Sequence, residues 1–171
     1  MGTHNLLLAL GTTTYLEVIS VDPQAAPIAR ARWFGLDHVQ PDSSPRLAAW
    51  VASTSDIAGA ATPEIGEVET MRRDLHTWQM AVRSDGAPPL GGAAPLLIQR
   101  TPGADPVAAL PKHDLRLERL LIRHPDPTRV LALLHRLQLH ERPAVAVELG
   151  SACSLVAEIQ TPSGLRRLGE A

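Results

Sequence analysis

The chain has 171 residues and a formal net charge of −2, and 44% of its residues are hydrophobic. This length suits one domain, or one domain with an appended module, and the near-neutral charge gives no general attraction to nucleic acid or anionic membranes. The single cysteine excludes an internal disulfide framework, and no apolar run approaches the roughly 18 residues of a membrane span, so the composition favours a cytoplasmic protein.

The first predicted elements are two antiparallel strands, at residues 6–10 and 14–21, joined by a short turn. His4 and Asn5 precede the first strand, and Glu17 interrupts an otherwise apolar second strand. A buried carboxylate needs a partner, so Glu17 is either satisfied by an arginine or backbone donor at the sheet rim, or acts as a general base or ligand-orienting group. His4 and Asn5 either cap the hairpin or offer hydrogen bonds to a bound carbonyl.

Prolines interrupt the next segment, residues 22–42, which we expect to be an ordered loop. Trp33 and Phe34 stand next to a glycine near its middle. Two large aromatic residues at such a place either cover a cavity or anchor a long loop.

Three strands and a short helix are predicted next. Residues 47–53 have the apolar character of a strand. Asp56 is typical of a helix N-cap, but Gly59 leaves room for about two turns at most. Residues 77–82 and 95–99 then predict a hairpin across a loop rich in glycine and proline.

The last third of the chain predicts a strand, a helix and three further strands. Asp126 is a good N-cap, and Pro127 suits the first helical position because it lacks the amide that would have no partner there. The expected elements are a strand at residues 115–122, a helix at 127–137, and strands at 144–149, 154–160 and 165–168.

The segments Gly-Thr-His-Asn at residues 2–5 and Tyr-Leu-Glu-Val-Ile around Glu17 resemble the glyoxalase-like branch of the vicinal-oxygen-chelate (VOC) superfamily. The resemblance implies an α+β fold of βαβββ modules, with curved antiparallel or mixed sheets and few helices, that cups a small-molecule ligand. Residues 1–100 would form a glyoxalase-like domain lacking the first strand and helix of its first module, residues 101–113 a linker, and residues 114–171 an additional module. The open sheet edge predicts a homodimer in which a second copy covers it.

Metal-dependent members of this superfamily hold a divalent ion with His and Glu side chains from the first and last strands of paired modules. Glu17 matches a last-strand glutamate and is the candidate metal ligand. Residues 47–51 contain no histidine, and Gln99 stands where the family has a carboxylate. A neutral amide is a poorer ligand for such an ion. The sequence therefore predicts an incomplete metal site.

Residues 71–78 also resemble a family segment in which an arginine and a tryptophan precede the second hairpin. A guanidinium beside an indole can hold a carboxylate while the ring covers its apolar body. The alternative is a solvated basic loop and a core tryptophan. The resulting candidate site has Glu17 as the catalytic residue and, as ligand-binding residues, His4, Asn5, Trp33, Arg72, Arg73, Trp78 and Gln99.

Three functions remain open at this point. The first is that the chain is an enzyme related to the lyases, isomerases or dioxygenases of the superfamily, with Glu17 as a general base or a metal ligand. Alternatively, it is a metal-free protein that binds a small molecule in the same cup. The third hypothesis is that the chain is an inactive remnant of the family, whose paired sheets serve only in the assembly of protein subunits.

Overall fold

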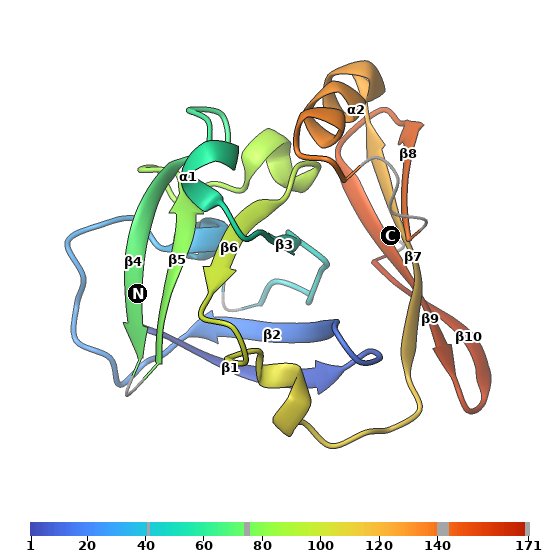
Figure 1. Cartoon of the computed structure of the whole chain (residues 1–171), viewed down its shortest axis with the longest axis horizontal. Helices are drawn as coiled ribbons and strands as arrows, with labels where there is room; N and C mark the ends of the chain where they lie inside the picture. Colours follow the sequence, from blue (N-terminus) through green and yellow to red (C-terminus); the bar gives the residue numbers. More distant parts are fainter. Residues whose placement is uncertain (41, 74–75, 140–143, 170–171) are drawn as a thin grey trace.

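The computed structural model describes residues 1–40, 42–73, 76–139 and 144–169. Within these residues the strands form one two-stranded and two four-stranded sheets (Figure 1). This mostly β architecture with few helices confirms the predicted α+β class. None of the helices in this part of the chain is long and apolar enough to cross a membrane.

The two-stranded sheet is the predicted first hairpin, except that its first strand begins at Thr3 rather than at residue 6, so that His4 and Asn5 lie within the strand and not before it. It pairs β1 (Thr3–Ala9) with β2 (Tyr15–Val21) in antiparallel register. Asn5 stands opposite Ile19, and because side chains alternate along a strand, Glu17 lies on the same face of the hairpin as this pair. The face that Glu17 shares with Asn5 is therefore fixed by the register.

The second sheet has the strand order β3-β6-β5-β4, with β3 parallel to β6 and the other neighbours antiparallel. Its short helix is one turn long, and Asp56 caps it by accepting a hydrogen bond from the amide of Gly59 at 3.0 Å, as predicted. The elements are β3 (Val51–Ser53), α1 (Ile57–Ala60), β4 (Glu67–Arg73), β5 (His76–Val82) and β6 (Leu96–Arg100).

Two strand predictions need correction in this sheet. The strand expected at residues 47–53 is shorter, because only Val51–Ser53 pairs with β6. Strand β4 was not predicted, since its charged residues resemble a loop. It lies at the edge of the sheet, where charged side chains are tolerated because one side of the strand is unpaired. Residues 74–75, within the segment predicted to resemble the family's Arg/Trp motif, lie outside the described residues.

The third sheet confirms the predicted order of strand, helix and three strands. Asp126 caps the helix by accepting a hydrogen bond from the amide of Arg129 at 3.0 Å. The elements are β7 (Arg116–His124), α2 (Pro127–Arg136), β8 (Val145–Leu149), β9 (Ser154–Thr161) and β10 (Gly164–Leu168). The strand order is β10-β9-β7-β8, so this unit shares the element order of the second sheet but not its strand arrangement.

Helix α2 joins the cores of the two four-stranded sheets. Leu133 packs in one buried cluster with Ile57, while Val130 packs in another with Ala93 and Ile122. The segment predicted as a linker, residues 101–113, contains the 3-10 helix η3 (Pro106–Ala109), whose Val107 is 1% exposed.

The described part of the loop between β2 and β3 carries the 3-10 helix η1 (Trp33–His38), in line with the predicted ordered loop. Trp33 is 7% exposed and packs in one cluster with Met80 of β5. A second 3-10 helix, η2 (Pro89–Gly92), lies before β6. The backbone around Trp33 is fixed by a hydrogen bond of 2.9 Å from the amide of Gly35 to the carbonyl of Gly86.

Candidate functional site

The candidate site lies where the first hairpin runs across the second sheet (Figure 1). Ile19 and Val21 of β2 pack in one cluster with Met71 of β4 and Met80 of β5, so the inner face of the hairpin is turned toward β4 and β5. We call the layer between them the cup. Its polar and aromatic members are Asn5, Tyr15, Glu17, Arg73, Trp78 and Arg100.

A chain of hydrogen bonds connects the two walls of the cup. The Nη1 of Arg73 donates to Oδ1 of Asn5 at 3.1 Å, and Nδ2 of Asn5 donates to Oε1 of Glu17 at 2.5 Å. These two bonds fix the orientation of the Asn5 amide, because its oxygen faces a donor and its nitrogen faces an acceptor. The half-buried Glu17 therefore has the partner that its place in a strand requires, and this partner is a neutral amide rather than an arginine.

A second polar pair, Tyr15 and Arg100, stands farther along the same layer. The Tyr15 hydroxyl accepts a hydrogen bond of 2.6 Å from Nη2 of Arg100, and the guanidinium lies 5.9 Å from the ring centroid. Burial raises the pKa of Tyr15. The positive charge of Arg100 acts against this increase, and the negative charge of Glu17 adds to it.

Sequence reasoning missed this pair, although a signal for it existed. Tyr15 precedes Glu17 by two positions in a strand and must share its face. Arg100 is the last residue of β6, one position beyond the predicted strand, and stands opposite Trp78 in the register.

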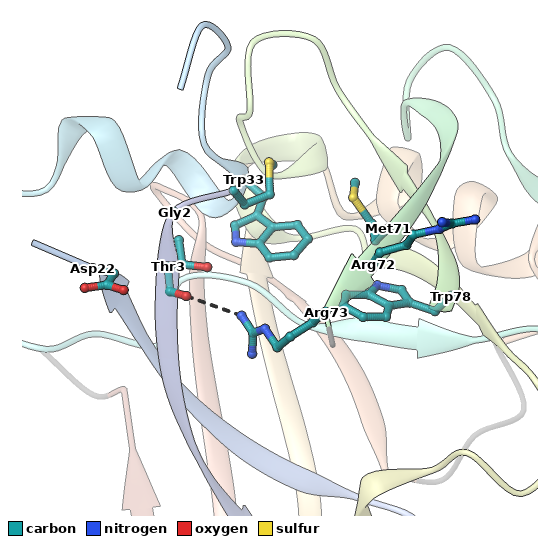
Figure 2. Close-up of a pocket in the computed structure, with 9 residues that line it drawn as sticks. Gly2, Thr3, Asp22, Trp33, Met71, Arg72, Arg73 and Trp78 are labelled. Carbon is teal, nitrogen blue, oxygen red and sulfur yellow. Dashed lines mark hydrogen bonds between the residues drawn. The ribbon is translucent and has the colours of Figure 1, made fainter. Parts of the chain in front are cut away.

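A hollow of about 170 Å³ lies beside the hydrogen-bonded chain, at the start of β1 (Figure 2). Four of the predicted ligand-binding residues belong to its wall: Trp33, Arg72, Arg73 and Trp78. Of these, Arg72 directs its side chain away from the hollow, on the other face of β4 from Arg73. Thr3 lines it as well, and its carbonyl accepts a hydrogen bond of 3.3 Å from Nη2 of Arg73. Residues from β1, η1, β4 and β5 thus form one small cavity.

Two predicted ligand-binding residues, His4 and Gln99, do not reach the cup. His4 follows Thr3 and so lies on the opposite, outer face of β1, where it is exposed and its Nε2 is 2.6 Å from the Ser20 hydroxyl. Oε1 of Gln99 accepts a hydrogen bond of 2.8 Å from the amide of Ile57, which places it on the α1 side of the sheet. The structure thus places both side chains outside the cup.

The described residues do not form a set that fits a divalent metal ion. No three His, Cys, Asp or Glu side chains in this part of the chain are grouped to hold one. The carboxylate of Glu17 is bonded to Asn5, and Gln99 faces away from the cup. In the segment where the family places a first-strand ligand, the indole of Trp50 donates to the carbonyl of Ala93 at 3.2 Å.

Comparison with known proteins supports the family resemblance. Neither a curated protein nor a solved structure matches the chain. The glyoxalase-like domain family matches residues 1–138, a stretch that includes the first hairpin, the whole second sheet, β7 and α2. The chain therefore belongs to the glyoxalase-like domain family of the VOC superfamily.

Proposed function

We propose that the protein binds a small oxygenated metabolite in the cup between the first hairpin and β4–β6. The observation that carries this proposal is the chain of hydrogen bonds from Arg73 through Asn5 to Glu17, because Arg73 at its start lines a cavity with two tryptophans in its wall. Half-buried polar groups with fixed orientation next to apolar rings are typical of sites that recognise small molecules.

Two side chains have hydrogen-bonding groups that no protein atom uses, and these define which ligand groups the cup would recognise. Oε1 of Glu17 is occupied by Asn5, which leaves Oε2 to accept a hydrogen bond from a ligand hydroxyl. The Tyr15 oxygen accepts from Arg100, so its own proton is available to donate to a ligand carbonyl. An acceptor and a donor on one face of β2 suit a small molecule that carries hydroxyl and carbonyl oxygens.

The proposal is tested by calorimetric titration with three-carbon probes that carry adjacent oxygens: pyruvate, lactate and hydroxyacetone. We expect binding of at least one probe. The affinity of lactate or hydroxyacetone, whose hydroxyl can donate to Glu17, should fall about tenfold or more in Glu17→Gln, because a hydrogen bond to a charged group is lost. The matched control is His4→Gln, on the outer face of β1, which should leave binding unchanged. Equal affinity of the Glu17→Gln variant and the parent protein would reject the cup as the binding site.

A further inference from the structure

The cavity at the start of β1 contains one guanidinium group. Arg73 of β4 points into it, whereas the side chain of the neighbouring Arg72 leaves the opposite face of β4 and points away (Figure 2). Asp22 is the carboxylate in its wall. Asp22 accepts a hydrogen bond of 2.9 Å from the amide of Gln24. Within the described residues Arg73 forms no ion pair, and it donates hydrogen bonds to two neutral oxygens, of Asn5 and of Thr3. A guanidinium that is bonded only to neutral oxygens can still pair with a ligand anion.

The same cavity has polar atoms that lack a partner. Nε1 of Trp33 and Oγ1 of Thr3 are both enclosed and have no hydrogen-bond partner among the described residues. Trp33 is 93% buried, since it is 7% exposed, and in Figure 2 the nitrogen-bearing edge of its indole faces Thr3. Unpaired enclosed donors are rare in folded proteins and are expected where a ligand supplies the missing acceptor.

The size and the apolar part of the wall limit the ligand. A cavity of about 170 Å³ is smaller than the roughly 300–1,000 Å³ typical of drug-sized ligands, so it accepts one small group. Met71 and Trp78 stand opposite each other on β4 and β5 and form an apolar side next to Arg73. A planar anion with a short apolar body fits this combination.

We propose that this cavity binds the carboxylate group of the cup's ligand, which is accordingly a small oxygenated carboxylic acid. The inference rests on the proposed function and names the ligand's chemical class. One carboxylate oxygen takes hydrogen bonds from Arg73, and the other takes them from the Trp33 indole and the Thr3 hydroxyl. The rest of the ligand extends along Arg73 and Asn5 toward Glu17.

Entry of the ligand requires only side-chain movement at the rim. Met1 and Gly2 complete the wall of the cavity. A methionine side chain has three rotatable bonds and adapts easily to a new neighbour. The hydroxyl of Thr3 turns about one bond to meet an acceptor.

The test compares pyruvate with hydroxyacetone, its neutral analogue, and with inorganic phosphate as an alternative anion. Binding is measured by calorimetry and by the indole N–H signal of Trp33 in proton-nitrogen correlation spectra, which is assigned from its loss in Trp33→Phe. We expect pyruvate to bind at least about tenfold more tightly than hydroxyacetone and to shift the Trp33 signal. Arg73→Gln should abolish this preference, whereas Arg116→Gln on the distant strand β7 should keep it.

Each result decides the proposal. Equal affinity for pyruvate and hydroxyacetone, with hydroxyacetone binding weakened by Glu17→Gln, would reject the carboxylate site and leave the proposed function standing. Tighter binding of phosphate than of pyruvate would also reject the carboxylate site. If pyruvate, lactate and hydroxyacetone all fail to bind, both the carboxylate site and the proposed function are wrong.

Discussion

Arg73 on β4 donates a hydrogen bond to the side-chain oxygen of Asn5 on β1, although 68 positions separate the two residues in sequence. The bond joins the first hairpin to the second sheet across the cup. Because the same amide also donates to Glu17, Asn5 holds the carboxylate at a fixed place in the layer between the sheets. The geometry of the candidate site thus depends on one asparagine.

Removal of this amide should destabilise the protein. Asn5→Ala deprives Glu17 of its donor and Arg73 of one acceptor, and the loss of hydrogen bonds to charged groups at a half-buried place costs about 1–3 kcal/mol. The measurement is urea unfolding of the variant and the parent. His4→Ala is the matched control, since His4 on the outer face loses only an exposed bond to Ser20. Equal destabilisation by the two substitutions would contradict the assigned faces of β1.

The chain has one tyrosine, so its titration can be followed directly by ultraviolet absorbance. Burial raises the pKa of Tyr15, and Arg100 acts in the opposite direction. We expect the absorbance midpoint to lie above the ordinary value of 10.0 and to move higher still in Arg100→Met. Arg116→Met on β7 should leave the midpoint unchanged. A midpoint below 10.0 in the parent protein would contradict the buried placement of the ring.

The raised pKa of Tyr15 also predicts how stability depends on alkaline pH. A phenol whose pKa is higher in the folded than in the unfolded state stabilises the fold fully below the unfolded value. This contribution is lost as pH rises through the folded pKa. The alkaline loss of unfolding free energy should therefore be smaller in Tyr15→Phe than in the parent protein, as measured by urea unfolding across this pH range. An identical alkaline slope would show that the phenol does not contribute.

Gly86 controls the place of Trp33 through the backbone. A Cβ at Gly86 would lie 2.1 Å from the carbonyl oxygen of Arg32, the residue before Trp33. Gly86→Ala should therefore displace the loop and weaken ligand binding, with a stability loss of about 1–3 kcal/mol. Gly103→Ala is the control, because Gly103 also has a positive φ but no atom within 4 Å of an added Cβ. Equal losses in thermal unfolding would show that the close contact has no effect.

The placement of Gln99 outside the cup can be tested by substitution. Gln99→Leu leaves the amide of Ile57 without its acceptor, so we expect a stability loss of about 1–3 kcal/mol with unchanged affinity for pyruvate. Gln79→Leu is the control, since Gln79 pairs with Gln99 in the register but is exposed. Loss of pyruvate binding without loss of stability would return Gln99 to the binding site.

The first hairpin and the elements of the third sheet could be predicted from the sequence, because characteristic turn and helix-cap residues mark them. Asp126 and Pro127 predicted the start of α2 because they act through local backbone geometry. Strand β4 was not predictable in the same way, since its charged residues are typical of a loop and become a strand only through pairing with β5 at the sheet edge.

The candidate site was predictable only in part. The face of the sheet on which a side chain lies depends on the register of the strands and on how the sheets pack. His4 and Asn5 are consecutive residues of one strand, so their side chains must lie on opposite faces of it. This difference can be recognised from the local sequence once both residues are assigned to the strand. Gln99 differs, because it follows a run of apolar residues that are buried on both faces of β6, and such a run does not show which side meets the ligand. The contact between Arg73 and Asn5 depends on how two sheets cross, and no local pattern contains it.

The most direct measurement of the central claim is the set of intermolecular nuclear Overhauser effects from the methyl protons of bound pyruvate. If the inner face of the first hairpin forms the site, these protons contact the rings of Tyr15, Trp33 or Trp78. Contacts instead to Leu6 and Val18, which are 76% and 60% exposed on the outer face, would contradict the account.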